Sequence, residues 1–427
     1  MPSATPPGAE STVTAQAWRL LAFLTALSVL NFVDRQLIAS LAPLLIDDLG
    51  LTRAQIGLLA GFAFVVFYTL SGLFLGMIAD RSPRLRLIAV GLALWSAMTA
   101  ASGAAQRFAH LAAARVMVGI GEATLTPAAL SILGDVFPLS RLGLATGIYY
   151  AGIPIGTALS LFIAGWIAPA YGWRACFYAL GILGLLMVGA LLVMPEPPRR
   201  VSHVSTGAPG ARAIVATLRR ALRREPALLL VLLGGTALTF WAGANLLTIT
   251  WLVQERGFDF RRAAFASGFI AAAAGFLGNV FGGWFGDWCD ERWRGGRVWS
   301  MAIMSLVLAP SGAAFFLMPT SSPFFYVCWF LTSASTTAWF GPLFATIQHL
   351  APPAIRSTTV AFGLLVLNLL GVGPGPWITG LIGDVSSLTR GLVVAAGVEL
   401  AAVVPLVLAA RRLERDEAEA RRVEATA

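Results

Sequence analysis

Two oppositely charged residues stand alone in a long apolar stretch of this sequence. Arg115 and Glu122 lie in the run from about residue 108 to residue 136, which holds no other Arg, Lys, Asp or Glu before Asp135. Seven residues make about two helical turns, so both side chains share one helix face roughly 10 Å apart. A charge at membrane depth costs between ~3 and more than 10 kcal/mol. Each is therefore expected to face a partner or a water-filled cavity, with glycines at 119 and 121 allowing another helix to approach.

A second charged pair, Asp34 and Arg35, follows Asn31 in the first apolar run. Burial raises the free energy of an ionised carboxylate and a nearby arginine lowers it, so a change of access can couple protonation to conformation. We therefore predict Asp34 and Glu122 as proton-coupling residues. The alternative is that Asp34–Arg35 and Arg115–Glu122 are static ion pairs. The two arginines, with Asn31, are predicted to bind substrate, because a guanidinium suits phosphate or carboxylate.

Composition places the chain in a membrane. Hydrophobic residues make up 57% of the 427 residues, charged residues 12%, and the mean hydropathy is +0.78, outside the soluble range. The net charge of +9 comes from basic residues between apolar runs, as in cytoplasmic loops, so no nucleic-acid partner is expected. Three dispersed cysteines and the lack of nucleotide or hydrolase motifs predict no metal site, no cofactor and no enzyme.

Apolar runs long enough to span a membrane recur twelve times, in two groups of six. This predicts an all-α membrane protein of twelve transmembrane helices in two six-helix repeats. The first group occupies roughly 18–46, 55–79, 85–106, 108–136, 142–169 and 173–194, and the second roughly 226–253, 263–286, 297–318, 322–350, 357–383 and 389–410. The predicted units are a disordered tail (1–17), an N-terminal bundle (18–194), a cytoplasmic linker with a basic interfacial helix (195–225), a C-terminal bundle (226–410) and a cytoplasmic tail (411–427).

The arginines fix the predicted orientation. With twelve spans, 21 arginines fall on the side of both termini and seven on the other, while two lie within spans. Because cytoplasmic loops carry the excess of positive charge, both termini are predicted to be cytoplasmic, in a bacterial inner membrane.

An internal repeat marks a candidate gate on that cytoplasmic side. The segment from Gly76 to Arg84 closes the second span, and a degenerate copy beginning at Gly283 closes the eighth; Pro-x-x-Arg opens the fifth and eleventh spans at a similar offset. An acid at a helix end, basic residues after it and a glycine where helix ends cross can latch the two halves. The alternative is ordinary loop charge. The predicted gate residues are Gly76, Asp80, Arg81, Arg84, Asp135, Arg141, Gly283, Asp287, Arg292 and Arg356.

Further polar and aromatic residues complete the predicted substrate site. Trp241 and Asn245 are four residues apart on the seventh span and can share a face, and Tyr150 lies in the fifth span. Core packing is the alternative for each of them. Glu399 is a lone acid in the twelfth span. The charged pairs thus lie in the first half alone, an asymmetry that suits an amphiphile with an anionic head.

These motifs resemble the major facilitator superfamily over nearly the whole chain. The sequence G-x-x-x-D-R-x-x-R from Gly76 to Arg84 is similar to the signature of that superfamily. Within it, Asn31-Phe-Val-Asp34-Arg35, Arg115-x-x-x-Gly-x-Gly-Glu122-Ala, Tyr150-Ala-Gly-Ile-Pro-Ile-Gly and Tyr-Gly-Trp-Arg at 171–174 resemble the Spinster group of lipid transporters and their bacterial relatives.

The resemblance implies a rocker-switch fold, a monomer in the lipid bilayer, and proton-linked transport of a lysophospholipid or a lipid like sphingosine-1-phosphate, with protons as the coupling ion. Bacterial anion:proton symporters carry a similar Asp-Arg and Arg…Glu-Ala, so a small organic anion is the alternative substrate. A multidrug/proton antiporter is a third possibility. A channel is disfavoured, because pores are built from rings of like residues in an oligomer.

Overall fold

The computed structural model describes residues 14–79, 82–199, 225–351 and 356–426, and these residues form helices without strands. In the first half the helices are α1 (Ala15–Ser40), α2 (Ala42–Leu49), α3 (Arg53–Gly57), the π-helix η1 (Leu58–Phe62), α4 (Ala63–Ala79), α5 (Arg84–Gly103), α6 (Phe108–Glu122), α7 (Leu125–Val136), α8 (Leu139–Tyr150), α9 (Gly152–Tyr171) and α10 (Trp173–Val193).

The second half has the same helical character. Its elements are α12 (Pro226–Ala244), the 3₁₀ turn η2 (Asn245–Leu247), α13 (Thr248–Gln254), α14 (Phe260–Arg292), α15 (Gly296–Leu317), α16 (Phe325–Ala338), α17 (Phe340–Leu350), α18 (Arg356–Leu367), the π-helix η4 (Asn368–Val372), α19 (Pro374–Val385), α20 (Leu388–Ala401) and α21 (Val403–Thr426).

Eleven helical segments of the described chain are long and apolar enough to cross a membrane. They coincide with eleven of the twelve ranges predicted from the sequence. The remaining range, 322–350, is occupied by α16 and α17, which are separated by a break at Trp339. The predicted all-α, twelve-span architecture is therefore confirmed.

The contact between the halves follows the internal repeat. The α9 helix, in the fifth span, packs along α14, in the eighth, while α3 and η1, in the second span, pack against α19, in the eleventh. Each seam thus joins a second segment of one half to a fifth segment of the other. This is the arrangement that two parallel repeats produce when they face each other.

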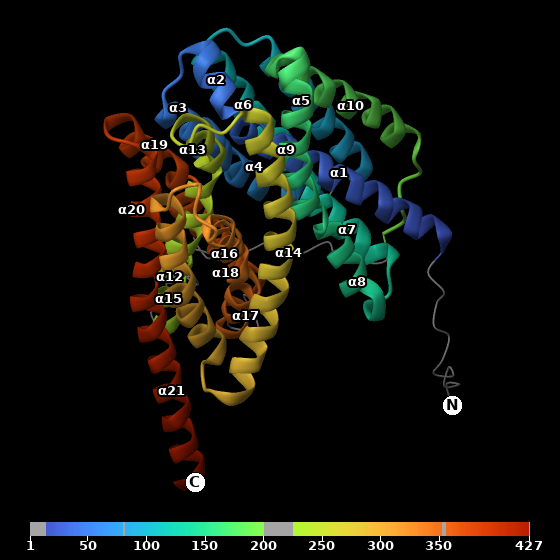
Figure 1. The fold of residues 1–427 in the computed structure, drawn as a ribbon. Coiled ribbons are helices and arrows are strands. Elements are labelled where there is room, and N and C mark those ends of the chain that lie inside the picture. The colour runs from blue at the N-terminus through green and yellow to red at the C-terminus, as the bar shows by residue number, and fades with distance from the viewer. Residues whose placement is uncertain (1–13, 80–81, 200–224, 352–355, 427) are drawn as a thin grey trace, which may run out of the picture.

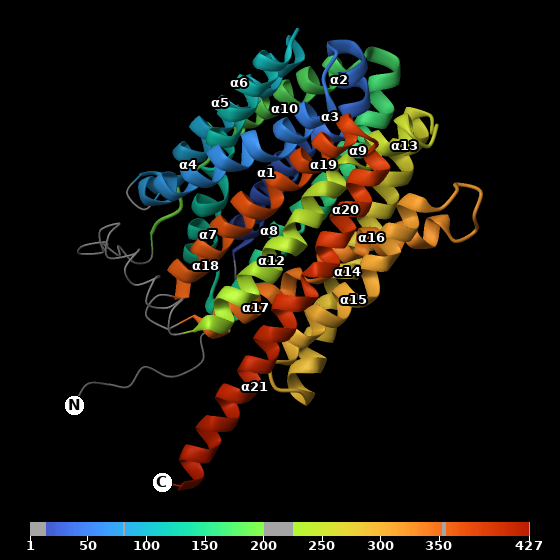
Figure 2. The same ribbon diagram turned by 90° about the vertical axis from the view of Figure 1, so that its left-hand side faces the viewer.

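The halves meet at one end of the molecule, which we call the outer end, where α2, α3, α13 and the α19–α20 junction lie (Figure 1). Toward the opposite end α7 and α8 diverge from α14 and α17, and α21 continues beyond the bundle (Figure 2). We call this opposite end the terminal end. The main packing partners of α7, α8, α17 and α18 lie within their own halves. The structure is therefore closed at the outer end and separated at the terminal end.

Glycines set the closest helix packing in the first half. A Cβ at Gly119 would lie 3.0 Å from the Phe64 carbonyl oxygen, and one at Gly121 would lie 2.8 Å from the Gly91 carbonyl oxygen. The predicted close approach at these two glycines is confirmed. The predicted gate glycines differ from these two, because a Cβ at Gly76 or Gly283 would meet nothing within 4 Å. In the second half a Cβ at position 282 would overlap the Ala338 carbonyl oxygen, and a Cβ at Gly341 would lie 3.4 Å from the Gly283 Cα atom.

The glycine contacts generate a stability prediction. Gly121→Ala should lower the free energy of unfolding by ~1–3 kcal/mol, because α6 cannot move away from α5 without disturbing the packing on its other side. Gly134→Ala on α7 is the control, since its Cβ would meet nothing within 4 Å. The measurement is the thermal unfolding midpoint of the purified protein in detergent. Equal midpoints for the two variants would contradict the packing argument.

Candidate functional site

Four charged side chains from α1 and α6 meet in the first half, and their pairing is crossed. The Arg35 guanidinium donates to Glu122 Oε2 from Nη2 at 3.1 Å and from Nε at 3.3 Å. Arg115 Nη1 lies 3.9 Å from Asp34 Oδ1 and 3.5 Å from the Asp34 carbonyl oxygen. The sequence suggested pairs within each motif, Asp34 with Arg35 and Arg115 with Glu122. The structure corrects this, because both pairs join two helices.

Helix geometry explains the crossing. Asp34 and Arg35 are adjacent in sequence, so their side chains leave α1 about 100° apart and point to different neighbours. Arg115 and Glu122 are two turns apart on α6, about 10 Å along its axis. Each therefore meets a different residue of α1, and the four charges neutralise one another in a compact block.

The α6 helix ends at Glu122. Thr124 Oγ1 donates to the Gly121 carbonyl oxygen at 2.8 Å, and α7 begins at Leu125. Pro127 lacks an N–H, so the helical hydrogen bond to the carbonyl of residue 123 cannot form. A proline and a back-bonded hydroxyl break the span, which places Glu122 at the junction of α6 and α7.

Aromatic rings surround the more accessible arginine. The Arg35 guanidinium carbon lies 4.4 Å from the Tyr68 ring centre, 4.6 Å from that of Phe32 and 4.8 Å from that of Phe64. Its side chain is 24% exposed, whereas the Glu122 side chain is fully buried. These rings are not among the residues predicted from the sequence. The spacing of Phe64 and Tyr68 by four residues is the one signal that they share a helix face.

The pair between Arg115 and Asp34 is buried. The side chains of Arg115 and Asp34 are 1% and 3% exposed, and Thr99 donates a hydrogen bond to Asp34 Oδ2. Several polar atoms in the block lack a hydrogen-bond partner: Asn31 Nδ2, Asp34 Oδ1, Arg115 Nε and Glu122 Oε1. Buried polar atoms are normally satisfied, so these atoms mark a place for water, a proton or a polar ligand group.

The remaining predicted substrate residues differ in their surroundings. Asn31 Oδ1 accepts from Arg35 Nη2 at 3.3 Å, so Asn31 belongs to the charged block. Tyr150 is 39% exposed and lies edge-on to Tyr149. Asn245 Nδ2 donates to the Trp241 carbonyl oxygen at 3.0 Å, at the break between α12 and η2. Trp241 is fully buried and donates to Ser335. The structure therefore places Trp241 in the helix core, the alternative that the sequence left open.

The first predicted gate segment contains a strong network within the N-terminal half. Arg84 is buried at the start of α5, where it pairs with Asp135 at the end of α7. Glu196 accepts from the Arg84 backbone N–H at 2.9 Å and from its Nε at 3.3 Å. The contact with Asp135 lies within the N-terminal bundle, and Glu196 lies just beyond that bundle, in the predicted linker. Arg141 is exposed in the first turn of α8.

In the second copy the cation that pairs with Asp287 is not one of the predicted gate residues. Asp287 pairs with Arg297 at 3.0 Å, and Arg297 also pairs with Asp290 at 2.8 Å. Arg292 contacts its neighbour Glu291 at 3.7 Å and lies over the Trp288 ring. Asp80, Arg81 and most of the predicted basic linker lie outside the described residues. Arg356 begins α18, and its side chain lies outside the described part of the structure.

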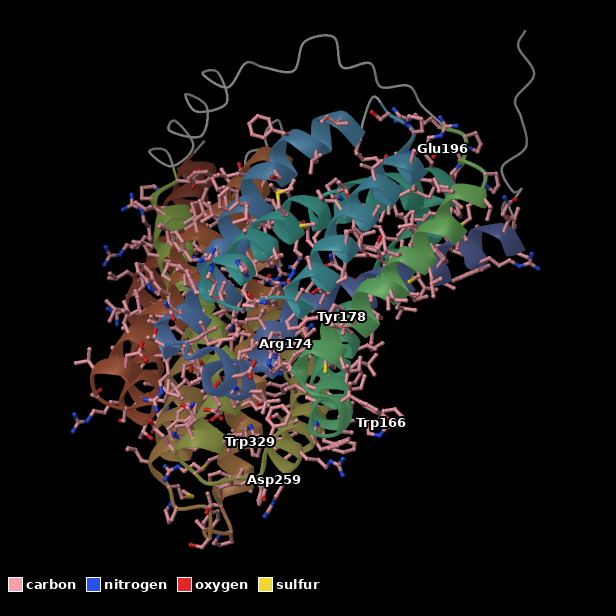
Figure 3. All side chains as sticks on the ribbon, turned by 90° about the horizontal axis from the view of Figure 1, so that it is seen from above. Trp166, Arg174, Tyr178, Glu196, Asp259 and Trp329 are labelled. Atoms are coloured by element: carbon pink, nitrogen blue, oxygen red, sulfur yellow. The ribbon has the colours of Figure 1, made fainter. Side chains whose placement is uncertain are left out.

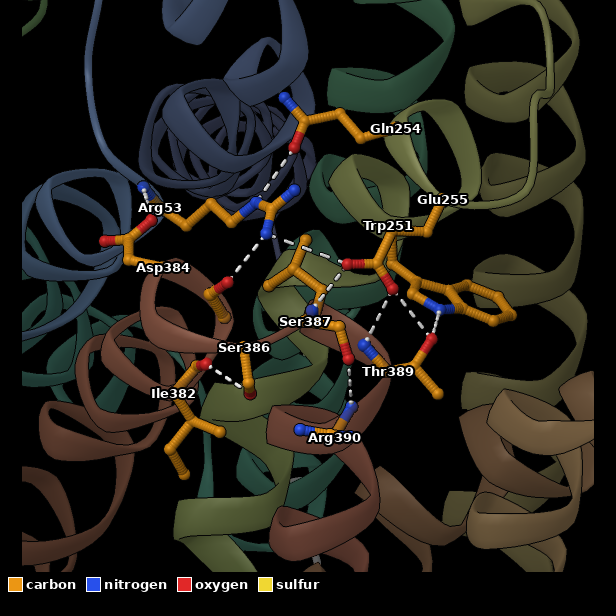
Figure 4. A network of polar contacts seen from close by, with 12 residues as sticks. Arg53, Trp251, Gln254, Glu255, Ile382, Asp384, Ser386, Ser387, Thr389 and Arg390 are labelled. Atoms are coloured by element: carbon orange, nitrogen blue, oxygen red, sulfur yellow. Dashed lines mark hydrogen bonds and ion pairs between the residues drawn. The ribbon is translucent and has the colours of Figure 1, made fainter.

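At the outer end a polar cluster joins the two halves (Figure 4). The backbone N–H groups of Arg53 and Ala54 donate to Asp384 at 2.8 and 2.9 Å. The Arg53 guanidinium donates to the Gly383 carbonyl at 2.7 Å and to Gln254 at 3.1 Å, and it lies 3.7 Å from Glu255. We call Arg53, Gln254, Glu255 and Asp384 the outer latch. From the sequence alone, Arg53 is expected to be only a loop charge.

The outer latch is also anchored within the C-terminal half. Glu255 accepts from the backbone N–H groups of Leu388 and Thr389 at 2.6 and 2.9 Å, and so caps α20. Asp384 caps α3 in the other half by the same chemistry. A carboxylate at a helix N-terminus satisfies unpaired N–H groups and the helix dipole together. The latch therefore depends on backbone geometry as well as on side-chain charge.

A further ion pair at the outer end holds the first half together. Arg174, labelled in Figure 3, donates to Asp48 at 2.7 Å, and Trp173 Nε1 donates to the same oxygen at 3.0 Å. The Arg174 hydrogen bond is the main reason why the pKa of Asp48 lies below its usual value, with the indole adding to the effect. Trp166, exposed at the side of the molecule (Figure 3), is the kind of residue that anchors a span at the membrane interface.

The family follows from the fold and from sequence comparison. Residues 24–376 match the model of the Major Facilitator Superfamily, which is most of the chain. The protein belongs to this superfamily and is a multi-pass membrane transporter, not an enzyme. Among the described residues no group of His, Cys, Asp and Glu side chains is arranged to hold a metal ion.

Individual relatives show which members of the superfamily the chain resembles. An MFS-type efflux pump of Mycolicibacterium smegmatis (strain ATCC 700084 / mc(2)155) is 30% identical over 417 residues, which cover 94% of each chain. Protein spinster of Drosophila melanogaster is 27% identical over 398 residues, covering 90% of this chain and 64% of the relative. A bacterial homologue of the human lysosomal transporter Spinster, solved in an inward-facing and unoccupied conformation, superposes with a TM-score of 0.78 at 26% identity, covering 95% and 97% of the two chains. The predicted likeness to the Spinster group is confirmed.

The crossed pairing generates a double-mutant prediction. Removing either partner of a buried ion pair costs ~3–5 kcal/mol, because the other charge is left uncompensated. Arg35→Gln and Glu122→Gln should therefore be strongly non-additive in unfolding free energy. Arg115→Gln and Glu122→Gln should couple more weakly, since their nearest charged partners are different residues. Thermal unfolding of the single and double variants measures both couplings, and a larger coupling for Arg115 with Glu122 would contradict the crossed arrangement.

The outer latch generates a conformational prediction. Asp384→Asn removes charge-assisted hydrogen bonds worth ~1.5–3 kcal/mol, so molecules open at the outer end should become about tenfold to a hundredfold more frequent. Spin labels at Gln106 and Ser321, both exposed at the outer end, report the distance between the halves. Asp259→Asn is the matched control, because Asp259 caps α14 within its own half. A distance distribution that is the same in both variants would rule out a latching role.

Proposed function

We propose that this protein is a proton-coupled secondary transporter of an amphiphilic anion, of the lysophospholipid or sphingosine-1-phosphate kind, working by rocker-switch alternating access. Glu122 and Asp34 carry protons, and Arg35 and Arg115 hold or release the anionic head. We place it as a monomer in a bacterial inner membrane with both termini in the cytoplasm. The separated terminal end then makes the described conformation inward-facing.

The observation that carries this proposal is the pair between Arg35 and Glu122. The Arg35 side chain is partly exposed and has two contacts with one carboxylate oxygen, while Glu122 Oε1 has no partner. A proton bound by Glu122 removes the negative charge that holds Arg35. The guanidinium is then available to an anion, and one anion and one proton replace one internal ion pair. The site stays neutral in both states, which keeps the cost of burial low.

The surroundings of Arg35 support an amphiphilic substrate. Phe32, Phe64 and Tyr68 lie around the guanidinium, so the place where an anionic head would bind is lined by apolar surface. Charged pairs within the spans belong to the first half, whereas the second half contributes the single acid Glu399 to its spans. An anionic head with a long apolar tail fits this division. A lipid-like substrate is also supported by the likeness to the sphingosine-1-phosphate transporter SPNS2 of Mus musculus, which is 26% identical over 386 residues.

Substrate-driven proton flux tests the proposal. Purified protein is placed in proteoliposomes containing a pH dye and is exposed to lysophospholipids, sphingoid phosphates and small organic anions. We expect a lipid-dependent flux in the wild type and its loss in Glu122→Gln. The same variant should bind the anion about tenfold or more tightly, because Arg35 no longer has a competing carboxylate worth ~1.5–3 kcal/mol.

The control is Asp416→Asn, which neutralises an exposed acid of α21 and should leave the flux unchanged. A flux observed with organic anions alone would show that the substrate is a small organic anion and not a lipid. It would leave the proposed roles of Glu122 and Asp34 unchanged. A flux that persists unchanged in Glu122→Gln and in Asp34→Asn would exclude these carboxylates as proton carriers.

A further inference from the structure

The Asp34 carboxylate has a neutral neighbour on a third helix, in addition to the charged residues of α1 and α6. Thr99 lies in α5, is 2% exposed, and donates a hydrogen bond from its Oγ1 atom to Asp34 Oδ2. The other carboxylate oxygen, Oδ1, is buried without a hydrogen-bond partner. Within the described part of the chain, Thr99 is therefore the one hydrogen-bond donor to this carboxylate.

Arg115 supplies charge to Asp34 but does not orient its carboxylate. Its Nη1 atom lies 3.9 Å from Asp34 Oδ1, beyond hydrogen-bonding distance. Its two Nη atoms donate instead to the backbone carbonyl oxygens of Asp34 and Arg35, at 3.5 and 3.3 Å. Glu122, by contrast, receives two hydrogen bonds from the Arg35 side chain. The two acids of the block are thus held differently, Glu122 by a partly exposed guanidinium and Asp34 by a buried hydroxyl.

The hydroxyl of Thr99 leaves the usual partner of a helical threonine unused. A threonine inside a helix commonly donates to the carbonyl oxygen four residues earlier, and Thr25, Thr157 and Thr236 do so at 2.8, 3.0 and 2.8 Å. A hydroxyl has a single hydrogen, and Thr99 gives it to the carboxylate of another helix. Branching at Cβ restricts χ1, and α5 packs against both α6 and α10. The core therefore sets the direction of this hydrogen bond.

The charges around Asp34 are few and lie on two helices. They are Arg35 on α1 and Arg115 and Glu122 on α6, whose one histidine is in its first turn. The other charges of α1 and those of α2, α3, α5, α7, α8 and α10 lie near the helix ends, and α4, α9 and α13 have none. The remaining titratable groups of these helices are uncharged when protonated: Tyr68, Tyr149, Tyr150, Tyr171, Cys176 and Tyr178. A substitution at Thr99 therefore changes the surroundings of Asp34 without changing their charge.

We propose that Thr99 is a positioning residue for the proton on Asp34, which holds Oδ2 and so directs the proton to Oδ1. This inference rests on the proposed function, in which Asp34 takes up and releases a proton. A hydroxyl that donates to Oδ2 favours the ionised carboxylate, and it leaves the oxygen without a partner as the place where a proton binds. A proton on Oδ1 lies on the side of Arg115 and cancels the attraction between the two residues.

Infrared titration of Asp34 tests the proposal without a transported substrate. The Glu122→Gln background removes the other acid of the block, and the carboxylic acid band that Asp34→Asn abolishes in this background belongs to Asp34. We expect Thr99→Val to raise the pH midpoint of that band by about one unit, which corresponds to about tenfold tighter proton binding. The carbonyl stretch should also move to higher wavenumber, because Oδ2 loses its donor.

Two further variants control for a general effect on packing. Thr99→Ser keeps the hydroxyl and should restore the midpoint of the unsubstituted background. Thr25→Val is the matched control, because Thr25 donates within α1, and it should leave the midpoint unchanged. If Thr99→Val does not fold, Thr99→Ala gives the same comparison. An unchanged midpoint and band in the folded Thr99 variant would overturn the proposal, as would an Asp34 that binds no proton between pH 4 and pH 9.

The pH profile of substrate-driven flux, measured with Glu122 intact, separates this inference from the proposed function. A flux that is lost in Asp34→Asn and shifted toward higher pH by Thr99→Val supports both. A flux indifferent to Asp34→Asn removes Asp34 from the transport cycle, and the proposed function then fails at this residue. A shifted infrared titration would still support the positioning role of Thr99 in that case.

Discussion

The need to neutralise charge inside an apolar bundle governs the first half of this protein. Two arginines and two acids share one buried block, and neither helix could hold its own charges alone. The solution requires α1 and α6 to be in register, so that each guanidinium reaches the carboxylate of the other helix. It also requires α6 to break after Glu122, and the small residues near the break to let α4 and α5 pack closely. The packing of these helices, and the transport role proposed for the block, thus depend on one electrostatic constraint.

The polar contacts at the two ends of the molecule differ in kind. At the outer end, carboxylates cap helix N-termini, and one of these caps crosses from the C-terminal half to α3. At the terminal end the described ion pairs, such as Arg84 with Asp135 and Arg297 with Asp287, stay within their own halves. Caps are short-range and directional, so they hold only when the helices are in contact. The described ion pairs at the terminal end lie within single halves, so they need no contact between the halves.

Much of this could be predicted from the sequence. The lengths of the apolar runs predict the membrane spans, because the thickness of a membrane fixes how long a span must be. The isolated charges within those runs predict the position of the candidate site. The pairing of the charges could not be predicted, since spacing within one helix says nothing about the rotation of its neighbour. The outer latch was missed because Asp384 and Arg53 are 331 residues apart and resemble ordinary loop charges. The spacing of Trp241 and Asn245 is compatible with a cavity face and with the helix core. Only the packing of α12 shows that Trp241 points into the core.

The two π-helices give the fold a mechanical property. Residues of η1 and η4 touch where the halves cross. Beside this contact, a Cβ at Gly61 would lie 2.6 Å from the carbonyl oxygen of Gly373, the residue that follows η4. On one side of this contact lies α3, five residues or about 8 Å long; on the other lies α4, 17 residues or about 26 Å long. If the contact acts as a fulcrum, the arms of the lever differ about threefold. A small displacement at the short arm, near the latch, then becomes a displacement about three times larger at the far end of α4.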